Sequence, residues 1–343
     1  MAERVWFGTR LGARAGRAAL WPASVCFRGS VALRNLAYDR RLLRARAGAI
    51  PAIGVGNLTV GGTGKTPVAA WLAGELARRG AHPAIVLRGY GGDEPLVHER
   101  LNPGVPVVVA SDRLGGLAEA ARRGADIGVL DDAFQHRRAA RLADVVLVAA
   151  ERGLTPARLL PAGPYREPPA SLRRASLVVV TRKTASPEQA AAVLARATGI
   201  SGGPGAVVHL APGALVWTAG GGEGAVPADL TGRRVVLLTG VGEPGLVRDQ
   251  LAGLGARVEL QAYPDHHAFS NSELARAAGA AGGAAAVVCT LKDAVRIGAR
   301  WTGSVPLWYV SQRLTIDQGA EHLARLLDAA MAAAVRWTPP TAG

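Results

Sequence analysis

The feature that most constrains this chain is a glycine-rich stretch, residues 54–66, which reads Gly-Val-Gly-Asn-Leu-Thr-Val-Gly-Gly-Thr-Gly-Lys-Thr. An apolar run, residues 50–55, leads into it, and residues 67–79 have the pattern of a helix. A strand, a glycine loop and a helix N-terminus in this order form a cradle whose backbone N–H groups and helix dipole attract phosphate. In such a loop, Lys65 reaches the terminal phosphates and the Thr66 hydroxyl binds Mg2+. The stretch therefore predicts a nucleotide site.

One position departs from the strict form of this motif, which has glycine six residues before the lysine where this chain has Thr59. Gly61, Gly62 and Gly64 still provide the tight backbone that the loop needs. The alternative is a glycine-rich turn that binds nothing, but the flanking strand and helix favour a phosphate loop. The expected nucleotide-binding residues are Thr59, Gly61, Gly62, Thr63, Gly64, Lys65 and Thr66.

Length and composition indicate a globular protein of two domains. The chain has 343 residues, of which 49% are hydrophobic and 19% charged, so it can bury a sizeable core. Its two cysteines match no metal-binding spacing and suggest a reducing compartment. The formal net charge of +14 calls for an acidic partner, such as nucleic acid, an anionic membrane surface or a phosphorylated substrate.

Residues 1–46 form a basic segment with ten arginines against two acids, interleaved with aromatic and aliphatic side chains. The longest uncharged stretch, residues 18–27, is about half of the roughly 20 residues that span a bilayer. We expect an amphipathic segment that associates with an anionic membrane surface. Packing against its own domain and a nucleic-acid-binding arm are the two alternatives.

Short apolar runs alternate with helical patterns along the rest of the chain, which predicts a parallel sheet covered on both faces. The expected fold class is α/β, a P-loop NTPase-like αβα sandwich with a second, smaller α/β domain. A Gly- and Ala-rich stretch around residues 200–230 is the expected passage between them. The expected divisions are residues 1–46, the N-terminal segment; 47–212, the P-loop kinase domain; 213–315, the second domain; and 316–343, a closing helix and tail.

Acidic residues follow two of the predicted strands. Asp131 and Asp132 directly follow the apolar run 127–130, where an NTPase holds Mg2+, although aspartates there can also cap helices. Asp93 lies in a glycine-flanked loop and could accept the proton of an attacking hydroxyl group, or simply cap a helix. His266 could orient such an acid, or belong to a packing pair with His267.

Several of these motifs occur in an order that resembles the tetraacyldisaccharide 4'-kinase family of Gram-negative bacteria, across nearly the whole chain. They are residues 55–67, Arg88-Gly-Tyr90, Gly92-Asp-Glu-Pro95, Leu130-Asp-Asp-Ala-Phe-Gln-His-Arg138, Leu159-Leu-Pro-Ala-Gly-Pro-Tyr-Arg-Glu-Pro168, Pro264-Asp-His266 and Thr290-Leu-Lys-Asp293. The chain departs from the family in having no insert before Gly92, and in having Leu291 where the family has an acid.

The resemblance implies transfer of the γ-phosphoryl group of ATP to the 4'-hydroxyl of a tetraacylated glucosamine disaccharide 1-phosphate, which yields lipid IVA. It implies Mg2+ as cofactor and no nucleic acid as partner. The enzyme would be peripheral or monotopic on the cytoplasmic face of the inner membrane, whose surface is anionic. The implied roles are nucleotide and Mg2+ binding by Lys65 and Thr66; metal and phosphate contacts by Asp131 and Asp132; base and partner by Asp93 and His266; and positions near the site for Gln135, Arg166 and Glu167.

Two rival functions remain for the glycine loop taken without the resemblance. One is a P-loop switch or ATPase that drives a partner protein, and the other is a nucleic-acid-dependent NTPase that uses the arginine-rich N-terminus. Protein would stimulate ATP hydrolysis by the first, and DNA or RNA would stimulate hydrolysis by the second. A kinase would instead transfer label from γ-labelled ATP to a chloroform-soluble lipid.

Overall fold

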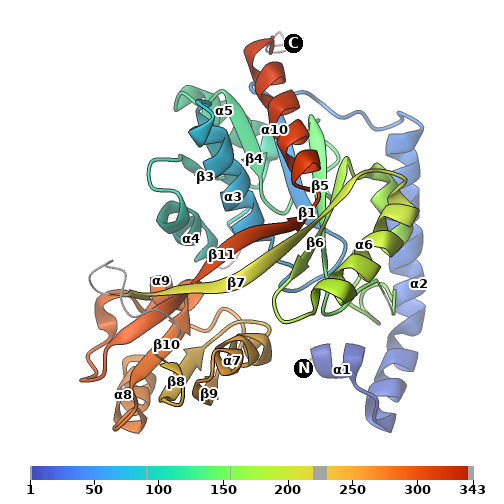
Figure 1. Cartoon of the computed structure of the whole chain (residues 1–343). Helices are drawn as coiled ribbons and strands as arrows, with labels where there is room; N and C mark the ends of the chain where they lie inside the picture. Colours follow the sequence, from blue (N-terminus) through green and yellow to red (C-terminus); the bar gives the residue numbers. More distant parts are fainter. Residues whose placement is uncertain (1, 90–91, 155, 219–229, 339–343) are drawn as a thin grey trace. The chain divides into compact units, whose positions relative to one another are not determined.

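The structure, a computed structural model, describes residues 2–89, 92–154, 156–218 and 230–338 (Figure 1). One motif position (Tyr90) and the adjacent Gly91, part of the expected inter-domain stretch and the end of the tail lie outside these residues. The chain forms two compact units: residues 1–88, 104–208 and 316–343 make up the first, and residues 89–103 and 209–315 the second. The sequence-based division placed residues 89–103 in the same domain as the phosphate loop. Their contacts instead place this segment, which includes Asp93, in the second unit.

The first unit contains six parallel strands in the order β3-β2-β4-β1-β5-β6. Their bounds are β1 Ala52–Asn57, β2 Pro83–Leu87, β3 Val107–Val109, β4 Ile127–Leu130, β5 Ala143–Ala149 and β6 Leu177–Arg182. In the register of the central strand, Ile53 lies opposite Val129 of β4 and Ala143 of β5. Because the strands are parallel, the segments that follow β1, β4 and β6 gather at one edge of the sheet.

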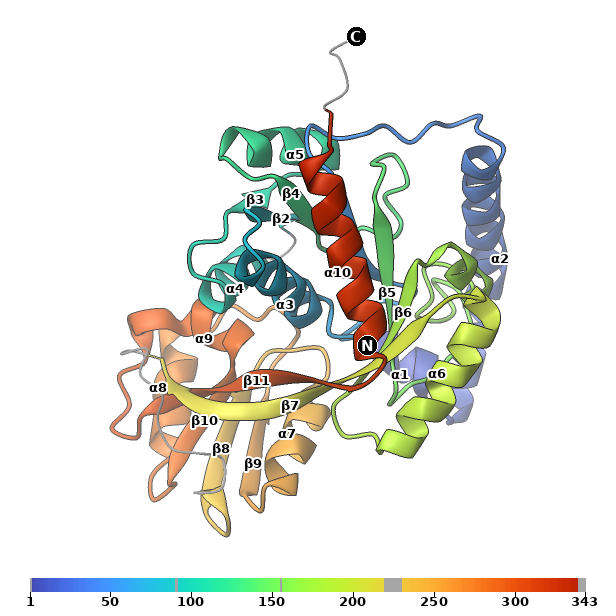
Figure 2. The same cartoon turned by 45° about the horizontal axis from the view of Figure 1, so that its top comes forward.

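Helices cover this sheet. They are α3 (Lys65–Arg78), α5 (Arg113–Arg122), α6 (Pro187–Ser201) and α10 (Ala320–Val335). α3 packs on β1, β2 and β4, α5 on β2 and β3, and α6 on β6. Every residue of β1 is buried, which accounts for its continuous apolar sequence. α10 lies along α3 (Figure 2), where Arg79 pairs with Asp328.

The N-terminal segment forms α1 (Ala2–Phe7) and the long α2 (Leu11–Asp39). One face of α2 packs on the first unit: Val31 is buried, Phe27 contacts the apolar cluster around Leu194, and Ser24 Oγ donates to the Leu159 carbonyl oxygen at 2.9 Å. One face of the N-terminal segment therefore packs against its own domain, which was one of the alternatives raised for residues 1–46. Within the described part of the chain, no helix combines the length and the apolar character needed to cross a bilayer.

The second unit has the strand order β11-β10-β8-β9, in which β11, β10, β8 and β9 pair in parallel. Its elements are α4 (Glu94–Leu101), β8 (Arg234–Thr239), α7 (Pro244–Gly253), β9 (Arg257–Ala262), α8 (Asn271–Ala280), β10 (Ala286–Thr290), α9 (Leu291–Ile297) and the 3-10 turn η3 (Gly298–Arg300). One core cluster joins β8 and β10 to Phe269 and Leu274. A separate 3-10 turn, η1 (Pro169–Arg174), belongs to the first unit.

Two long strands, β7 (Gly205–Trp217) and β11 (Leu307–Gln318), pass from one unit to the other. The sequence-based prediction of a helix beginning at Ile316 was therefore wrong: residues 316–318 extend β11, and α10 begins at Ala320. Gly319 separates the two elements with a φ of 76°, and a Cβ atom there would collide with the carbonyl oxygen of Gly205. For residues 316–318, pairing within the sheet as part of β11 outweighs the helical pattern of the sequence, and the helix begins only after Gly319.

Candidate active site

The phosphate loop connects β1 to α3 as its sequence predicts. Gly61 and Gly64 have φ angles of 116° and 80°, a backbone conformation that side chains with a Cβ rarely adopt. Gly64 immediately precedes α3, so Lys65 and Thr66 occupy the first turn of the helix. The loop thus presents a lysine, a hydroxyl group and the free backbone N–H groups of a helix N-terminus, the combination that binds a polyphosphate.

Side chains from β1, from β6 and from the residue that follows β6 support the loop by hydrogen bonds. Asn57 Nδ2 donates to Thr63 Oγ1 at 2.7 Å, and Thr181 Oγ1 donates to the Thr63 carbonyl oxygen at 2.9 Å. Lys183 Nζ donates to the carbonyl oxygen of Gly62 at 2.8 Å. Sequence reasoning assigned no role to these three supports. A signal was present for Lys183, because the chain has only three lysines and the other two are Lys65 and Lys292.

Two other predicted positions, Thr59 and Gln135, make contacts at the beginning of the loop. Thr59 forms an isolated antiparallel bridge with Tyr165, and Gln135 Nε2 donates to the Asn57 carbonyl oxygen at 2.9 Å. In the structure, Gln135 is therefore a support of the loop backbone. The bridge at Thr59 brings the segment that carries Arg166 and Glu167 next to the phosphate loop.

Asp132 lies between the two cations predicted for the site. Arg166 Nη1 donates to both of its carboxylate oxygens at 2.9 Å, and Lys65 Nζ lies 3.7 Å from Oδ1. Burial alone would raise the pKa of Asp132, but the charges of Lys65 and Arg166 hold it below its ordinary value. Its φ of 53° is left-handed, a strained conformation for a residue other than glycine and one that often accompanies a functional constraint.

Asp131 directly follows β4 and is buried. Its backbone N–H donates to the Val86 carbonyl oxygen at 3.0 Å, which extends the pairing of β4 with β2. No described helix begins at Asp131 or Asp132, so helix capping does not account for either carboxylate. Together with the Thr66 hydroxyl, these carboxylates are a hard-oxygen set of the kind that Mg2+ prefers.

Glu167 binds the segment that carries Arg166 and Glu167 to α2 through its buried carboxylate. Its side chain is 0% exposed and accepts hydrogen bonds from Arg34 and Asn35 of α2, each at 2.9 Å, and Arg174 Nη2 lies 2.9 Å from Oε2. The backbone of the preceding Arg166 donates to the Leu58 carbonyl oxygen at 2.7 Å. Arg166 and Glu167, both expected near the site, therefore bind different and distant partners: Arg166 binds Asp132, and Glu167 binds Arg34, Asn35 and Arg174.

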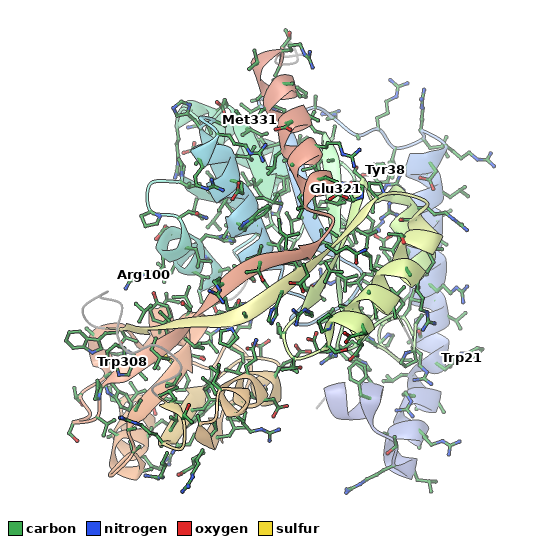
Figure 3. The ribbon with its side chains drawn as sticks, viewed as in Figure 1. Trp21, Tyr38, Arg100, Trp308, Glu321 and Met331 are labelled. Atoms are coloured by element: carbon green, nitrogen blue, oxygen red, sulfur yellow. The ribbon has the colours of Figure 1, made fainter. Side chains whose placement is uncertain are left out.

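Removing the charge of Glu167 is expected to destabilise the first unit. In Glu167→Gln, the Arg34 and Arg174 guanidinium groups lose their shared carboxylate, and we expect the free energy of unfolding to fall by about 3 kcal/mol, as for a broken buried ion pair. Urea unfolding followed by circular dichroism measures the change. Glu321→Gln, at an exposed acid of α10 (Figure 3), is the matched control with an expected change near zero. Equal midpoints for the two variants would contradict this prediction.

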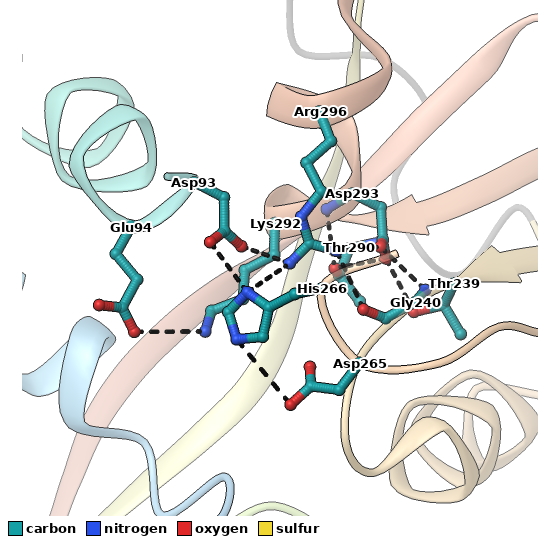
Figure 4. A network of polar contacts seen from close by, with 10 residues as sticks. All are labelled: Asp93, Glu94, Thr239, Gly240, Asp265, His266, Thr290, Lys292, Asp293 and Arg296. Atoms are coloured by element: carbon teal, nitrogen blue, oxygen red, sulfur yellow. Dashed lines mark hydrogen bonds and ion pairs between the residues drawn. The ribbon is translucent and has the colours of Figure 1, made fainter. Parts of the chain in front are cut away.

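Asp93 immediately precedes α4 but does not cap the helix with its side chain. Its carboxylate, 1% exposed, instead faces a loop and a helix of the same unit (Figure 4). Oδ1 lies 3.0 Å from His266 Nδ1, and Oδ2 accepts a hydrogen bond from Arg296 Nη2. Burial alone would raise the pKa of Asp93, but the hydrogen bond and charge of Arg296, with Lys292 and His266, lower it below the ordinary value.

The two adjacent histidines have different environments. His267 stacks on Tyr263 with 4.7 Å between ring centroids and lies 3.1 Å from Glu273, so it belongs to the packing around α8. His266 has a left-handed φ of 58° and a half-buried ring whose Nδ1 faces Asp93. The backbone strain at His266 resembles that at Asp132, and both residues were predicted from sequence to belong to the site.

The Thr290-Leu-Lys-Asp293 motif supplies the scaffold of this second cluster. Thr290 and Asp293 form a capping box at the start of α9, and the fully buried Asp293 accepts hydrogen bonds from Thr239 Oγ1 at 2.7 Å and Gly240 N at 2.9 Å. Lys292 Nζ lies 4.0 Å from Glu94. Leu291 packs on the apolar core, which suits its aliphatic side chain.

Taken together, the fold and these groups define a class of protein. A parallel α/β sheet carries a phosphate loop with a lysine, a hydroxyl and two carboxylates in one unit, and a carboxylate–imidazole pair lies in the other. These are the groups of a P-loop phosphotransferase that acts on an alcohol.

Comparisons with known proteins give the family. The family model described as tetraacyldisaccharide-1-P 4'-kinase (LpxK) matches residues 16–95 and 91–332. Accordingly, the chain belongs to the tetraacyldisaccharide 4'-kinase family, and its activity is the ATP-dependent 4'-phosphorylation step of lipid A synthesis. The family, the α/β P-loop fold and the kinase function expected from the sequence are all confirmed.

Individual relatives agree with this assignment. Tetraacyldisaccharide 4'-kinase of Anaeromyxobacter dehalogenans (strain 2CP-C) is 43% identical over 86% of this chain and 85% of its own length. The enzyme of Anaeromyxobacter sp. (strain K) is 42% identical over 98% and 97%. The crystal structure of LpxK from Aquifex aeolicus in complex with ATP superposes with a TM-score of 0.70 at 27% identity, covering 92% of this chain and 99% of that one.

Proposed function

We propose that the first unit binds Mg2+-ATP through the phosphate loop and that the Asp93–His266 pair of the second unit accepts the proton of the 4'-hydroxyl. The observation that carries the proposal is the 3.0 Å contact between Asp93 and His266, two residues 173 positions apart in the chain that the sequence motifs had paired. A buried carboxylate against an imidazole is the arrangement of a general base with its orienting partner.

The geometry of the loop supports the proposed nucleotide roles. Lys65 has an ion-pair partner, Asp132, at 3.7 Å, a separation at which the ammonium group can also bind phosphate oxygens. Arg166 is paired to the same carboxylate, so nucleotide binding would redistribute these cations between Asp132 and the phosphates. The relative from Aquifex aeolicus was solved with ATP, which supports ATP as the nucleotide here.

For Mg2+, the donor set fits. The Thr66 hydroxyl and the Asp131 and Asp132 carboxylates supply oxygen ligands, and Mg2+ in kinases is typically held by one or two carboxylates together with phosphates and water. Within the described residues, no group of three or more His, Cys, Asp and Glu side chains forms a metal cage, which is compatible with a site completed by the nucleotide. When bound, the ion would neutralise charge on the β- and γ-phosphates.

The geometry favours roles for Asp93 and His266 that differ from those expected from the sequence. Asp93 was expected to be the base, with His266 as its partner. Asp93 is almost inaccessible and both of its oxygens are engaged, whereas the His266 ring is 29% exposed. With a proton on Nδ1 donated to Asp93, Nε2 of the imidazole carries the lone pair that can take up the hydroxyl proton. We therefore assign proton uptake to His266 and orientation of the ring to Asp93.

Label transfer tests the proposed function directly. Purified protein would be incubated with γ-labelled ATP, Mg2+ and tetraacyldisaccharide 1-phosphate in detergent micelles, and label in the chloroform-soluble fraction would be counted. We expect lipid-dependent label that is lost in His266→Gln. Hydrolysis of ATP stimulated by protein or by nucleic acid, without labelled lipid, would support the rival functions instead.

We also propose that α2 seats the enzyme on the anionic cytoplasmic face of the inner membrane as a peripheral protein. Five exposed apolar residues lie on the side of α2 away from its packed face, namely Leu11, Trp21, Val25, Leu33 and Leu36. At 3.6 residues per turn they fall within an arc of about 120°. Trp21, 65% exposed, projects away from the first unit (Figure 3). Arg14 and Arg28 are also exposed on this helix, and such a face suits an anionic lipid surface.

Acidic substitutions on this face should release the protein from lipid. In the double variant Trp21→Glu with Leu33→Glu, we expect binding to phosphatidylglycerol-containing vesicles to fall by at least about 100-fold, because two apolar side chains can no longer enter the interface. Co-flotation with vesicles measures the bound fraction. Val335→Glu, at an apolar residue of α10 that is more exposed than Trp21 or Leu33, should bind as the unmodified protein does. Undiminished flotation of the double variant would refute the role of α2.

A further inference from the structure

Arg296 contacts both members of the Asp93–His266 pair (Figure 4). Its Nη2 donates to Asp93 Oδ2 and lies 3.3 Å from His266 Nδ1, the nitrogen that also faces Asp93 Oδ1 at 3.0 Å. The Arg296 side chain is almost buried, so solvent screens these interactions only weakly. The Asp93 carboxylate therefore has two cationic or potentially cationic partners, one on each oxygen.

Hydrogen-bonding chemistry restricts what His266 Nδ1 can do between these neighbours. A guanidinium group only donates and a carboxylate only accepts, so Nδ1 can satisfy just one of them. A proton on Nδ1 satisfies Asp93, and Arg296 Nη2 has Asp93 Oδ2 as its acceptor in any case. This assignment leaves Nε2 without a proton, and the carboxylate of the exposed Asp265 lies 3.9 Å from it.

The charge of Arg296 opposes protonation of the ring. A carboxylate beside an imidazole stabilises the imidazolium ion, and an imidazolium ion cannot accept the proton of a hydroxyl group. The Arg296 guanidinium group, bound to the other oxygen of Asp93, offsets the negative charge of the carboxylate. It would also repel a positive charge on the His266 ring, whose Nδ1 lies 3.3 Å away. Arg296 therefore offsets part of the charge that Asp93 presents to the ring, while Asp93 still orients the ring.

Arg296 is held in this position by the scaffold of α9. Its Nη1 donates to the Gly240 carbonyl oxygen at 3.0 Å and to Asp293 Oδ1 at 3.4 Å, and Asp293 is itself fixed by Thr239 and the Gly240 N–H. The charged groups that face the pair are thus Arg296, Asp293 and Lys292 from α9, Glu94 from α4, and Asp265 from the loop. Lys292 and Glu94 lie 4.0 Å apart, so their opposite charges partly cancel. Arg296 is the cation in direct contact with Asp93.

We propose that Arg296 is a positioning residue for the kinase reaction: it shares the Asp93 carboxylate with His266 and so sets the charge of the pair that accepts the proton of the hydroxyl group. The inference rests on the proposed roles of Asp93 and His266. It also explains the direction of the shift at Asp93, whose pKa the Arg296 hydrogen bond and charge lower against the effect of burial.

The test compares Arg296→Met with Arg296→Lys in the full chain. Without the guanidinium charge, the carboxylate charge falls on the imidazole alone, so the pair takes up its proton at higher pH. We expect the acid limb of kcat/KM to move upward by about one pH unit or more in Arg296→Met. Below both midpoints this lowers kcat/KM about tenfold, with recovery at alkaline pH. Arg296→Lys keeps the charge, and its acid limb should stay close to that of the unmodified enzyme.

A matched variant separates charge from scaffolding. Arg300 of η3 donates to the carbonyl oxygens of Phe269 and Arg296 and has no contact with Asp93. Arg300→Met should therefore lower the melting temperature without moving the acid limb. If Arg296→Met lowers kcat/KM by one factor at every pH and leaves the limb unmoved, Arg296 is only structural and the proposal is overturned.

A second readout does not depend on which residue is the base. The protonation midpoint of the Asp93–His266 pair can be followed through the imidazole 15N shifts of His-labelled protein, and we expect it to rise in Arg296→Met and not in Arg300→Met. If His266→Gln retained full turnover, the base assignment would fail, yet this midpoint would still test the sharing of the carboxylate. An unmoved midpoint in Arg296→Met would refute the inference whatever the outcome for the base.

Discussion

Lys65→Met is expected to lower kcat for lipid phosphorylation by at least about 1,000-fold, the scale of losing a cation that stabilises the transferring phosphoryl group. Methionine preserves much of the aliphatic stem but has no charge. Lys65 is the first residue of α3 and already lies 3.7 Å from Asp132, so the rest of the loop can remain in place. Label transfer from γ-labelled ATP measures kcat, and a fluorescent ATP analogue reports binding.

The chain offers a matched control for Lys65 in a second lysine at the same loop. Lys183 contacts the Gly62 carbonyl oxygen, so Lys183→Met removes a cation that supports the backbone and is expected to cost less than about tenfold in kcat. Lys65→Arg tests geometry at constant charge, because a planar guanidinium group does not replace a compact ammonium group at such a site. Turnover of Lys65→Met within tenfold of the unmodified enzyme would show that the loop does not hold the transferred phosphate.

Asp93→Asn is expected to lower kcat by about 1,000-fold while the dissociation constant for ATP stays the same. Asparagine keeps the shape of the side chain, but it removes the charge that orients His266 and that pairs with Arg296. An amide can also hold the ring in the wrong tautomer, and general base catalysis is worth about 100- to 10,000-fold. ATP binding should survive because Asp93 belongs to the second unit and the phosphate loop to the first.

Controls for Asp93 come from the same cluster. Asp265→Asn changes an exposed carboxylate 3.9 Å from His266 Nε2 and should cost less than about tenfold. His266→Gln should reproduce the loss seen in Asp93→Asn, and the double variant should lose little more, because residues that act as a unit are not additive. Near-normal turnover of Asp93→Asn would exclude this pair from the reaction.

Much of the first unit could be predicted because its signals are local. Continuous apolar runs marked buried parallel strands, and Gly61 and Gly64 marked the turn before α3. The predictions failed where a longer-range interaction determined the backbone. Residues 316–318 have a helical continuation after them, yet they extend β11, and Gly319 ends the strand beside Gly205. Pairing across such separations leaves little trace in a short window of sequence.

The site shows the same division between local and distant causes. The residue types and their order indicated Lys65, Thr66, Asp131 and Asp132 as candidates, because phosphate and Mg2+ each demand particular side chains, and the family resemblance added Asp93 and His266. Residue type alone did not distinguish His266 from His267, which differ in what surrounds them: His267 stacks on Tyr263, and His266 faces Asp93.

By itself, the sequence determined the nucleotide site and the family: a glycine loop with a lysine and a hydroxyl group, followed by paired carboxylates, indicated a bound nucleotide, and the order of the other motifs indicated the kinase family. Only the tertiary structure decided which partner each charge has. Arg166 pairs with Asp132 across 34 positions, Glu167 with Arg34 across 133, and Arg296 with Asp93 across 203. The physical reason is that an ionic or hydrogen-bonding side chain is specific in geometry but not in sequence separation, so its partner is fixed only when the packed strands and helices bring the two together.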